Sequence, residues 1–193
     1  MTTQPLLLAI STSSPALSIA LVAGDVVLAR RHEVIGRGHA EALVPAIANL
    51  LTGHALPHAV LVDIGPGSYT GIRIGIAAAR ALGLAWQVPV HGISGLSLVA
   101  AQAFAAERQL DAVLAVIDAG RGQAAGAAVL RGGVAAPAAV LAVAPAGIAA
   151  AGAGVQLLTD APPSVHDCHP DAGFAGLVPE EIWGQPTALY LGD

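Results

Sequence analysis

Short apolar runs, separated by turn residues, dominate the first part of the chain. Residues 6–10 (LLLAI) are apolar throughout, which predicts a central strand buried on both faces. In residues 17–21, Leu and Ile alternate with smaller or polar side chains and predict a second strand. Residues 26–34 predict a third strand that ends in polar side chains. Tight turns join the three strands, so we expect an antiparallel meander.

Helical periodicity begins at His39. Leu43, Ile47, Leu50 and Leu51 fall on one face of this helix. Pro45 is expected near the helix start, where its missing N–H costs least. Four more elements are predicted in order: a strand at 59–64, a helix at about 70–86, a strand at 88–93, and a helix capped by Ser94 that runs to Glu107.

This order of elements, β-β-β-α-β-α-β-α, is that of a ribonuclease-H-like lobe with a mixed sheet. The pattern restarts at Asp111, because residues 112–117 and 123–130 resemble the first two strands. The sequence therefore predicts an α/β, actin-like fold of two lobes, an N-terminal lobe at 1–108 and a smaller, reduced lobe at 109–193. Residues 131–163 show little periodicity, and we place no elements between 131 and 185.

A glycine-rich stretch, GPGSYTGIRIG at 65–75, connects the fourth predicted strand to the second predicted helix. Such a turn presents backbone N–H groups and a helix N-terminus, which suit an anion or a closely packed partner. We expect anion contacts, if any, at Gly65, Gly67, Ser68 and Thr70. A phosphate-binding P-loop is excluded, because that motif needs a Lys and all eight basic residues of this chain are Arg.

Small residues recur every fourth position on the helix after this loop, at Gly71, Gly75, Ala79 and Gly83. Another backbone can approach such a smooth row, either the protein's own sheet or a helix of a partner, and the sequence leaves both alternatives open. We predict a partner-binding surface on the two helices at about 40–52 and 70–86. Its residues are Leu43, Ile47, Leu50, Gly71, Ile72, Gly75, Ala79 and Gly83.

Candidate catalytic and metal-binding residues are few. Actin-like phosphotransferases need a carboxylate at the end of the first strand, and here that residue is Ser11. Asp118 ends the matching strand of the second lobe, where we favour a hydrogen bond to the turn at Gly120 over metal binding. His39 and Glu41 lack a second His, since Leu43 stands at the required i+4 position, and we favour a first-turn or surface role for His39.

Two further sets of histidines are weaker metal candidates. His54 and His58 are expected in a loop, because Leu56-Pro57 separates them. The run from His166 to His169 is dense in ligand types, but adjacent residues cannot all converge on one ion. We therefore predict no metal site, and no catalytic residue is assigned.

Composition and charge exclude several function classes. The net charge is −5 and there is no basic stripe, so the chain alone is a poor nucleic-acid binder. A single Cys rules out an intrachain disulfide and fits a reducing compartment. No apolar stretch has the roughly 18 uninterrupted residues of a membrane span. We expect a cytoplasmic protein with no signal peptide and no membrane association.

Several motifs together resemble the TsaB family of bacterial tRNA-modification proteins. They are LAIxTS at 8–13, HxExLxP at 39–45, the glycine loop at 65–75, Asp118-Ala119, and PxxxYL at 186–191. The resemblance implies a non-catalytic scaffold that pairs with the related transferase TsaD and is joined by the ATPase TsaE. This complex makes threonylcarbamoyladenosine at the tRNA adenosine next to the anticodon.

The resemblance also implies the partners and cofactors of the chain. It would pair with itself through the same surface when alone, and would meet tRNA only through the complex. No cofactor is implied, apart from weak nucleotide binding at the TsaD interface. The sequence departs from the family at Ser11, where Asp is usual, and at Gly120 and Gln123-Ala124. The rival functions are a small actin-like ATPase or kinase and, less favoured, a metallopeptidase.

Overall fold

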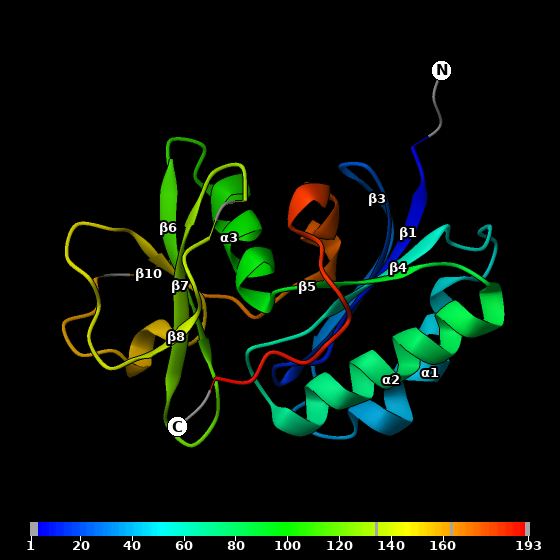
Figure 1. The fold of residues 1–193 in the computed structure, drawn as a ribbon, viewed down its shortest axis with the longest axis horizontal. Helices are drawn as coiled ribbons and strands as arrows, with labels where there is room; N and C mark the ends of the chain where they lie inside the picture. Colours follow the sequence, from blue (N-terminus) through cyan, green and yellow to red (C-terminus); the bar gives the residue numbers. More distant parts are fainter. Residues whose placement is uncertain (1–3, 134, 163, 192–193) are drawn as a thin grey trace.

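The computed structural model describes residues 4–133, 135–162 and 164–191, which form two lobes side by side (Figure 1). The first lobe is built on β1 (Leu6–Ser11), β2 (Ala16–Ala23), β3 (Val26–Val34), β4 (Ala59–Asp63) and β5 (Val90–Ile93). These strands form one mixed sheet in the order β3-β2-β1-β4-β5. The first three strands are antiparallel, whereas β4 and β5 run parallel to β1. The predicted ribonuclease-H-like lobe is confirmed.

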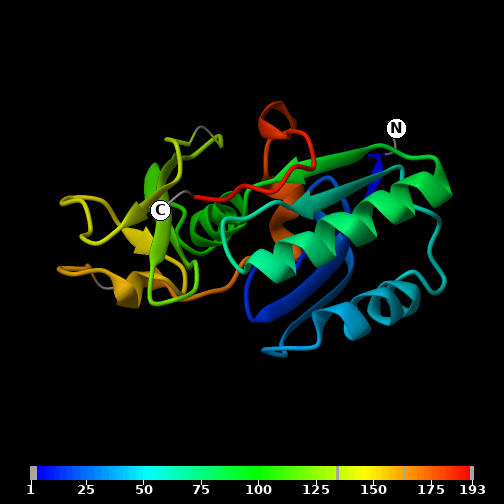
Figure 2. The same ribbon diagram turned by 60° about the horizontal axis from the view of Figure 1, so that its bottom comes forward.

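Helices cover both faces of this sheet. Two helices, α1 (His39–Leu50) and α2 (Tyr69–Trp86), lie next to each other on one face (Figure 2). Their apolar side chains pack with Leu8, Ile10 and other alternate residues of the strands. The third helix, α3 (Gly95–Ala106), contributes to the cores of both sheets, which explains why it is apolar all round. Ser94 caps it by accepting from the N–H of Leu96, as predicted.

The position of Pro45 corrects one expectation. Because α1 begins at His39, Pro45 lies inside the helix and not in its first turn. Its ring nitrogen cannot donate to the carbonyl of Glu41, so the helix lacks one internal hydrogen bond there.

The second sheet repeats the strand order of the first. Its strands are β6 (Ala112–Asp118), β7 (Ala124–Leu130), β8 (Ala139–Leu141), β9 (Ala150–Ala151) and β10 (Ser164–His166), in the order β10-β9-β6-β7-β8. As in the first sheet, β6 and β7 are antiparallel and β9 is parallel to β6. The described residues between β8 and β10 hold one short 3-10 helix, η1 (Val155–Leu157), and no α-helix. The duplicated, actin-like architecture is therefore present, with a reduced second lobe.

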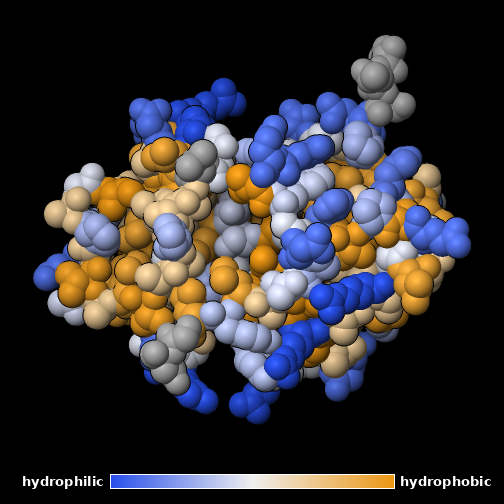
Figure 3. All heavy atoms as spheres, in the orientation of Figure 1, coloured by the Kyte–Doolittle hydropathy of each residue, from blue (hydrophilic) through white to orange (hydrophobic). Residues whose placement is uncertain are grey.

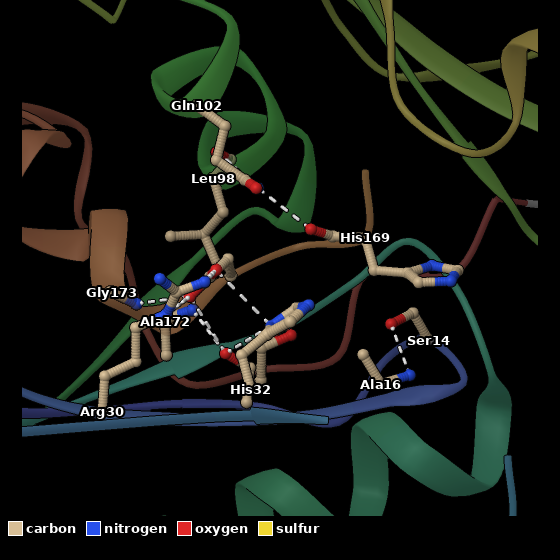
Figure 4. A network of polar contacts seen from close by, with 12 residues as sticks. Ser14, Ala16, Arg30, His32, Leu98, Gln102, His169, Ala172 and Gly173 are labelled. Carbon is tan, nitrogen blue, oxygen red and sulfur yellow. Dashed lines mark hydrogen bonds and ion pairs between the residues drawn. The ribbon is translucent and has the colours of Figure 1, made fainter. Parts of the chain in front are cut away.

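After β10 the chain returns to the first lobe. Two 3-10 helices, η2 (Ala172–Leu177) and η3 (Glu180–Ile182), follow, and Ala172 and Ala175 pack in the core of the first sheet. Asp171, which is buried, holds this returning segment against the first lobe. It accepts from the Nε of Arg30 at 3.0 Å and from the Oγ of Ser18 at 3.2 Å, and its Oδ2 lies 3.5 Å from the Nδ1 of His32. Figure 4 shows Arg30 and His32 in this cluster, next to Ala172 and Gly173. The predicted boundary between residues 108 and 109 stays a prediction.

The last described segment, residues 184–191, is an extended strap that runs from the first lobe towards the second (Figure 1). Gly184 forms an antiparallel bridge with Gly92 of β5. Farther along, Ala188 packs against the first-lobe core and Leu191 against the second-lobe core. In the part of the chain that is described, no helix is both long and apolar enough to cross a membrane.

Candidate functional site

The glycine loop is held in place by a buried carboxylate at the end of β4. Asp63 is 1% exposed and accepts hydrogen bonds from the Oγ of Ser11 at 2.6 Å and from the N–H of Gly65 at 2.8 Å. A third donor is the Oγ of Ser13, at 2.5 Å. Burial raises the pKa of Asp63, and the hydrogen bonds from the two serines partly oppose that shift. Ser11 thus supports a carboxylate on the neighbouring strand.

The glycines of the loop allow two backbones to touch. A Cβ on Gly67 would overlap the carbonyl oxygen of Ser13, and a Cβ on Gly71 would overlap that of Thr12. Gly67 also has a backbone φ of 150°, a conformation that residues with a side chain rarely adopt. The start of α2 is therefore pressed against the turn between β1 and β2.

The row of small residues on α2 packs against the protein's own sheet. A Cβ on Gly75 would lie 2.6 Å from the Oγ1 of Thr12, and one on Gly83 would overlap Val90 of β5. Gly71, Ala79 and Ile72 are also buried, as are Leu43 and Ile47 on α1, while Leu50 is partly exposed. Of the two alternatives that the sequence left open, the structure therefore gives the row an internal packing role. Contact of these eight residues with a partner stays a prediction.

A cleft of about 710 Å³ lies where the glycine loop and α1 face the second lobe. The turn after β1, the loop before α1, the start of α2 and the turn after β6 all line it. The polar lining residues are Ser13, Ser14, Arg37, His39, Glu41, Ser68, Tyr69, Thr70, Asp118 and Arg121. Of the four predicted anion contacts, Ser68 and Thr70 line this cleft and Gly65 and Gly67 do not. The N–H groups of Gly65 and Ser68 already donate to Asp63 and to the carbonyl of Ser13.

Four polar side chains of the cleft differ in their environments. Asp118 accepts from the N–H of Gly120 at 2.7 Å, which confirms the predicted turn. His39 is in the first turn of α1, as expected, but is only 8% exposed, and its Nε2 has no partner among the described residues. Among the described residues, the side chains of Arg37 and Arg121 form no hydrogen bond or ion pair.

The other histidine sets are dispersed. The Nδ1 of His58 accepts from the N–H of Leu6 at 3.0 Å, and His54 lies in the turn after α1. Burial raises the pKa of Cys168 to about 12, so its thiol stays protonated. No group of three or more potential metal ligands converges among the residues that the structure describes.

Beside the cleft, the outer faces of α1 and α2 carry apolar groups. Val44 is 56% exposed and Leu84 is 84% exposed. Where α2 begins, Tyr69 meets Tyr190 of the strap, with the ring centroids 4.9 Å apart and the ring planes tilted by 31°. Arg73 lies over the ring of Tyr69 at 3.8 Å and donates from Nε to the Oη of Tyr190 at 2.9 Å.

Comparison with known proteins places the chain in a family. The family model of tRNA N6-adenosine threonylcarbamoyltransferase (TsaD) matches residues 31–146, more than half of the chain. The solved structure of YeaZ from Pseudomonas aeruginosa superposes with a TM-score of 0.80 at 30% identity, covering 97% of this chain and 100% of that one. The chain belongs to the TsaB/YeaZ family. The resemblance seen in the sequence and the actin-like fold are both confirmed.

Curated members of the TsaB/YeaZ family match more than half of this chain. The tRNA threonylcarbamoyladenosine biosynthesis protein TsaB of Bacillus subtilis is 34% identical over 122 residues, covering 61% of this chain and 52% of that protein. TsaB of Escherichia coli is 36% identical over 121 residues, with the same coverage. The chain therefore spans about half the length of the curated relatives it matches.

Sequence reasoning missed three structural features of this family member. In the sequence, Asp63 was interpreted only as part of an apolar strand. A carboxylate at the end of a buried strand already indicates that polar partners must lie close to it, because a buried charge needs hydrogen bonds. The pairing of Arg30 with Asp171 joins residues 141 positions apart and has no local signal. Tyr190 was noticed as part of a motif, but nothing in the sequence shows that it meets Arg73.

Proposed function

We propose that this protein is a non-catalytic subunit that pairs with a TsaD-type transferase during threonylcarbamoyladenosine modification of tRNA. The observation that carries the proposal is the exposed apolar face of α1 and α2, within a chain of the TsaB/YeaZ family. The protein would act in the cytoplasm, would meet tRNA only within the complex, and would be joined there by a TsaE-type ATPase. A homodimer through the same face would form when the transferase is absent.

The proposed interface is the outer face of the helix pair. The exposed residues of these two helices include the small or apolar Ala40, Val44, Ala48, Ala77, Ala81 and Leu84, beside the polar or charged Glu41, Asn49, Arg73 and Arg80. Figure 3 shows apolar surface over these helices, broken by hydrophilic side chains. Small side chains permit close approach of two further helices, at interaxial distances of about 8–10 Å. Leu43, Ile47, Leu50 and the small-residue row would support this face from beneath.

The absence of catalysis is supported by the surroundings of Asp63. Its carboxylate is buried and already accepts three hydrogen bonds, so it is not free to hold a cation or to accept a proton from a substrate. At the strand end where a carboxylate would be needed stands Ser11, which is buried as well. We infer that the chain supports the transferase without performing the transfer.

The cleft has a separate, weaker role in this proposal. Unpaired Arg37 and Arg121 lie on opposite lobes, and the N-terminus of α2 adds a partial positive charge. Glu41 also lines the cleft, in the first turn of α1, where the helix dipole offsets its charge. We infer that a small oxyanion binds here weakly, with Ser68 and Thr70 at the rim.

Reconstitution tests the main proposal. The purified chain should form a complex of defined mass with the TsaD homologue of the same organism. Modification of tRNA by TsaD, TsaE and threonylcarbamoyl-adenylate should require the chain, while the chain alone should show no transferase activity and release no phosphate from ATP. Full modification without the chain would contradict a supporting role.

Matched variants locate the interface. Leu84→Asp should place a charge on the apolar face and weaken the complex by about tenfold or more, since burying an unpaired charge costs several kcal/mol. Val140→Asp is the control, because Val140 is an exposed valine of β8 in the second lobe. Equal loss of affinity in both variants would exclude the α1–α2 face.

A further inference from the structure

The stack of Tyr69, Arg73 and Tyr190 is exposed to solvent, and its three side chains contact one another. Tyr69 is 55% exposed and Tyr190 is 43% exposed, and the guanidinium lies between strap and helix. Arginine over an aromatic ring is a favourable cation–π arrangement. The Tyr190 hydroxyl raises the pKa of Arg73, so the side chain stays charged at any physiological pH.

The strap fixes this stack from behind. The N–H of Leu189 donates to the carbonyl of Ile64 at 2.7 Å, and Arg80 donates to the carbonyl of Pro186 at 2.8 Å. Ala188 and Leu191, on either side of Leu189 and Tyr190, pack into the cores of the first and second lobes. The position of Tyr190 is therefore set before any partner arrives, which lowers the entropy cost of binding.

Arg73 retains unused hydrogen-bonding capacity. Its Nε donates to Tyr190, whereas its two terminal nitrogens form no hydrogen bond or ion pair with the described residues. A planar fork of this kind fits a carboxylate in a bidentate manner. Tyrosine and arginine are also the residues most enriched at interface positions that dominate binding energy.

We propose that the Tyr69–Arg73–Tyr190 stack is an anchor that receives an Asp or Glu side chain of the protein partner. This inference rests on the proposed function, because the stack adjoins the α1–α2 face. A nucleic-acid phosphate is a poorer occupant. The chain carries a net charge of −5, and only Arg73 and Arg80 are cationic along α2, whereas phosphate backbones need several cations.

Affinity for the TsaD homologue, measured by calorimetry at several salt concentrations, tests the anchor. Arg73→Leu should weaken binding by about tenfold or more and flatten its salt dependence, because truncated interface anchors commonly cost this much. Arg73→Lys should restore only part of the affinity, since Lys lacks the fork. Tyr190→Phe should weaken binding by about threefold, because it removes the hydroxyl that orients Arg73 but keeps the ring. Arg31→Leu, an exposed arginine of β3, should leave the affinity unchanged.

A charge-reversal experiment tests the proposed ion pair most directly. Arg73→Glu should abolish binding, and an acidic residue of the partner changed to Arg should restore it. Wild-type affinity in Arg73→Leu, with complex formation intact, would overturn the anchor alone. Failure of the wild-type chain to bind TsaD would overturn both the anchor and the proposed function. Loss of tRNA binding with unchanged TsaD affinity would assign Arg73 to phosphate and overturn the anchor.

Discussion

The two lobes share one strand order but differ in what covers their sheets. In the first lobe, α1 connects β3 to β4 and α2 connects β4 to β5, and both helices pack on the same face. In the second lobe, the connection from β8 to β9 is residues 142–149, and the matching face is covered by loop residues around η1. A parallel crossover with a helix needs at least about 10–12 residues, so this connection is too short to contain one.

The difference lies in the surface that each kind of connection supplies. A helix connection supplies an exposed outer face in addition to its buried inner face, whereas a short loop supplies neither a broad nor a regular surface. The first lobe carries the helices with the exposed apolar residues Val44 and Leu84. The second lobe keeps the sheet and closes one wall of the cleft through Asp118 and Arg121.

The largest expected effect comes from breaking the contact of α2 with the first sheet. Gly71→Val would drive a side chain into the carbonyl of Thr12, which is backbone and cannot rotate away. We expect a loss of about 3 kcal/mol or more in unfolding free energy, at the upper end of overpacking costs, measured by denaturant unfolding. Gly184→Ala is the control, because no atom lies within 4 Å of its Cβ position. Stability equal to that of the wild type in Gly71→Val would mean that α2 is not fixed on the sheet.

A smaller loss is expected from Asp63, which has no counterpart after β9, where Gly152 follows the strand. Asp63→Ala would leave the donors from Ser11, Ser13 and Gly65 unsatisfied and should cost about 2–3 kcal/mol in unfolding free energy. Asp63→Asn should cost less, since the carboxamide retains one acceptor and the serine hydroxyls can turn.

The Asp63→Asn variant, compared with the wild type, also tests how stability depends on pH. Burial raises the pKa of Asp63 above its ordinary 3.8, so the folded protein holds this proton more tightly than the unfolded chain does. The contribution of this group to stability therefore falls as the pH rises from below 3.8 through the folded-state pKa. Comparing wild-type and Asp63→Asn unfolding across acidic pH isolates this slope. An opposite slope would show that the hydrogen bonds outweigh burial.

Hydrogen exchange measures the local stability of the two sheets and so compares the lobes directly. Amides of β4 and β5 lie in a sheet covered by helices, whereas β9 has two residues and is covered by loops on one side. We expect β9 and β10 to exchange at least about tenfold faster than β4, a difference of about 1.4 kcal/mol in local opening. Equal protection would mean that the reduced lobe is as stable as the complete one.

The weakest expected effect is anion binding between the lobes. Pyrophosphate, followed by calorimetry, should bind the wild-type chain weakly, and Arg121→Ala should lower its affinity about threefold to tenfold, within the range of exposed charge contacts. Arg108→Ala, which removes an exposed arginine outside the cleft lining, is the matched control. Unchanged affinity in Arg121→Ala would remove the second lobe from the anion site.

The sequence predicted the first lobe well because its elements are long enough to express a period. The strand at residues 6–11 and the helix capped by Ser94 are examples. Between 131 and 163 the strands have two or three residues, too few for alternation to be visible. The sequence could not show whether the Gly71–Gly83 row faces the protein's own sheet or a partner, since small residues suit any closely packed neighbour. His39 was expected in a first turn or at the surface, but its burial depends on the fold around it.

The Arg30–Asp171 pair has a consequence for the order of synthesis. The strand that carries Arg30 is made early, but Asp171 and the strap leave the ribosome only after the whole second sheet has been translated. Until then, Ser18 and Arg30 have no carboxylate partner, and the face of β1 and β2 that Ala172 and Ala175 cover is open to solvent. The nascent first lobe would therefore expose an apolar surface during translation, and its final closure would coincide with the arrival of residues 171–191.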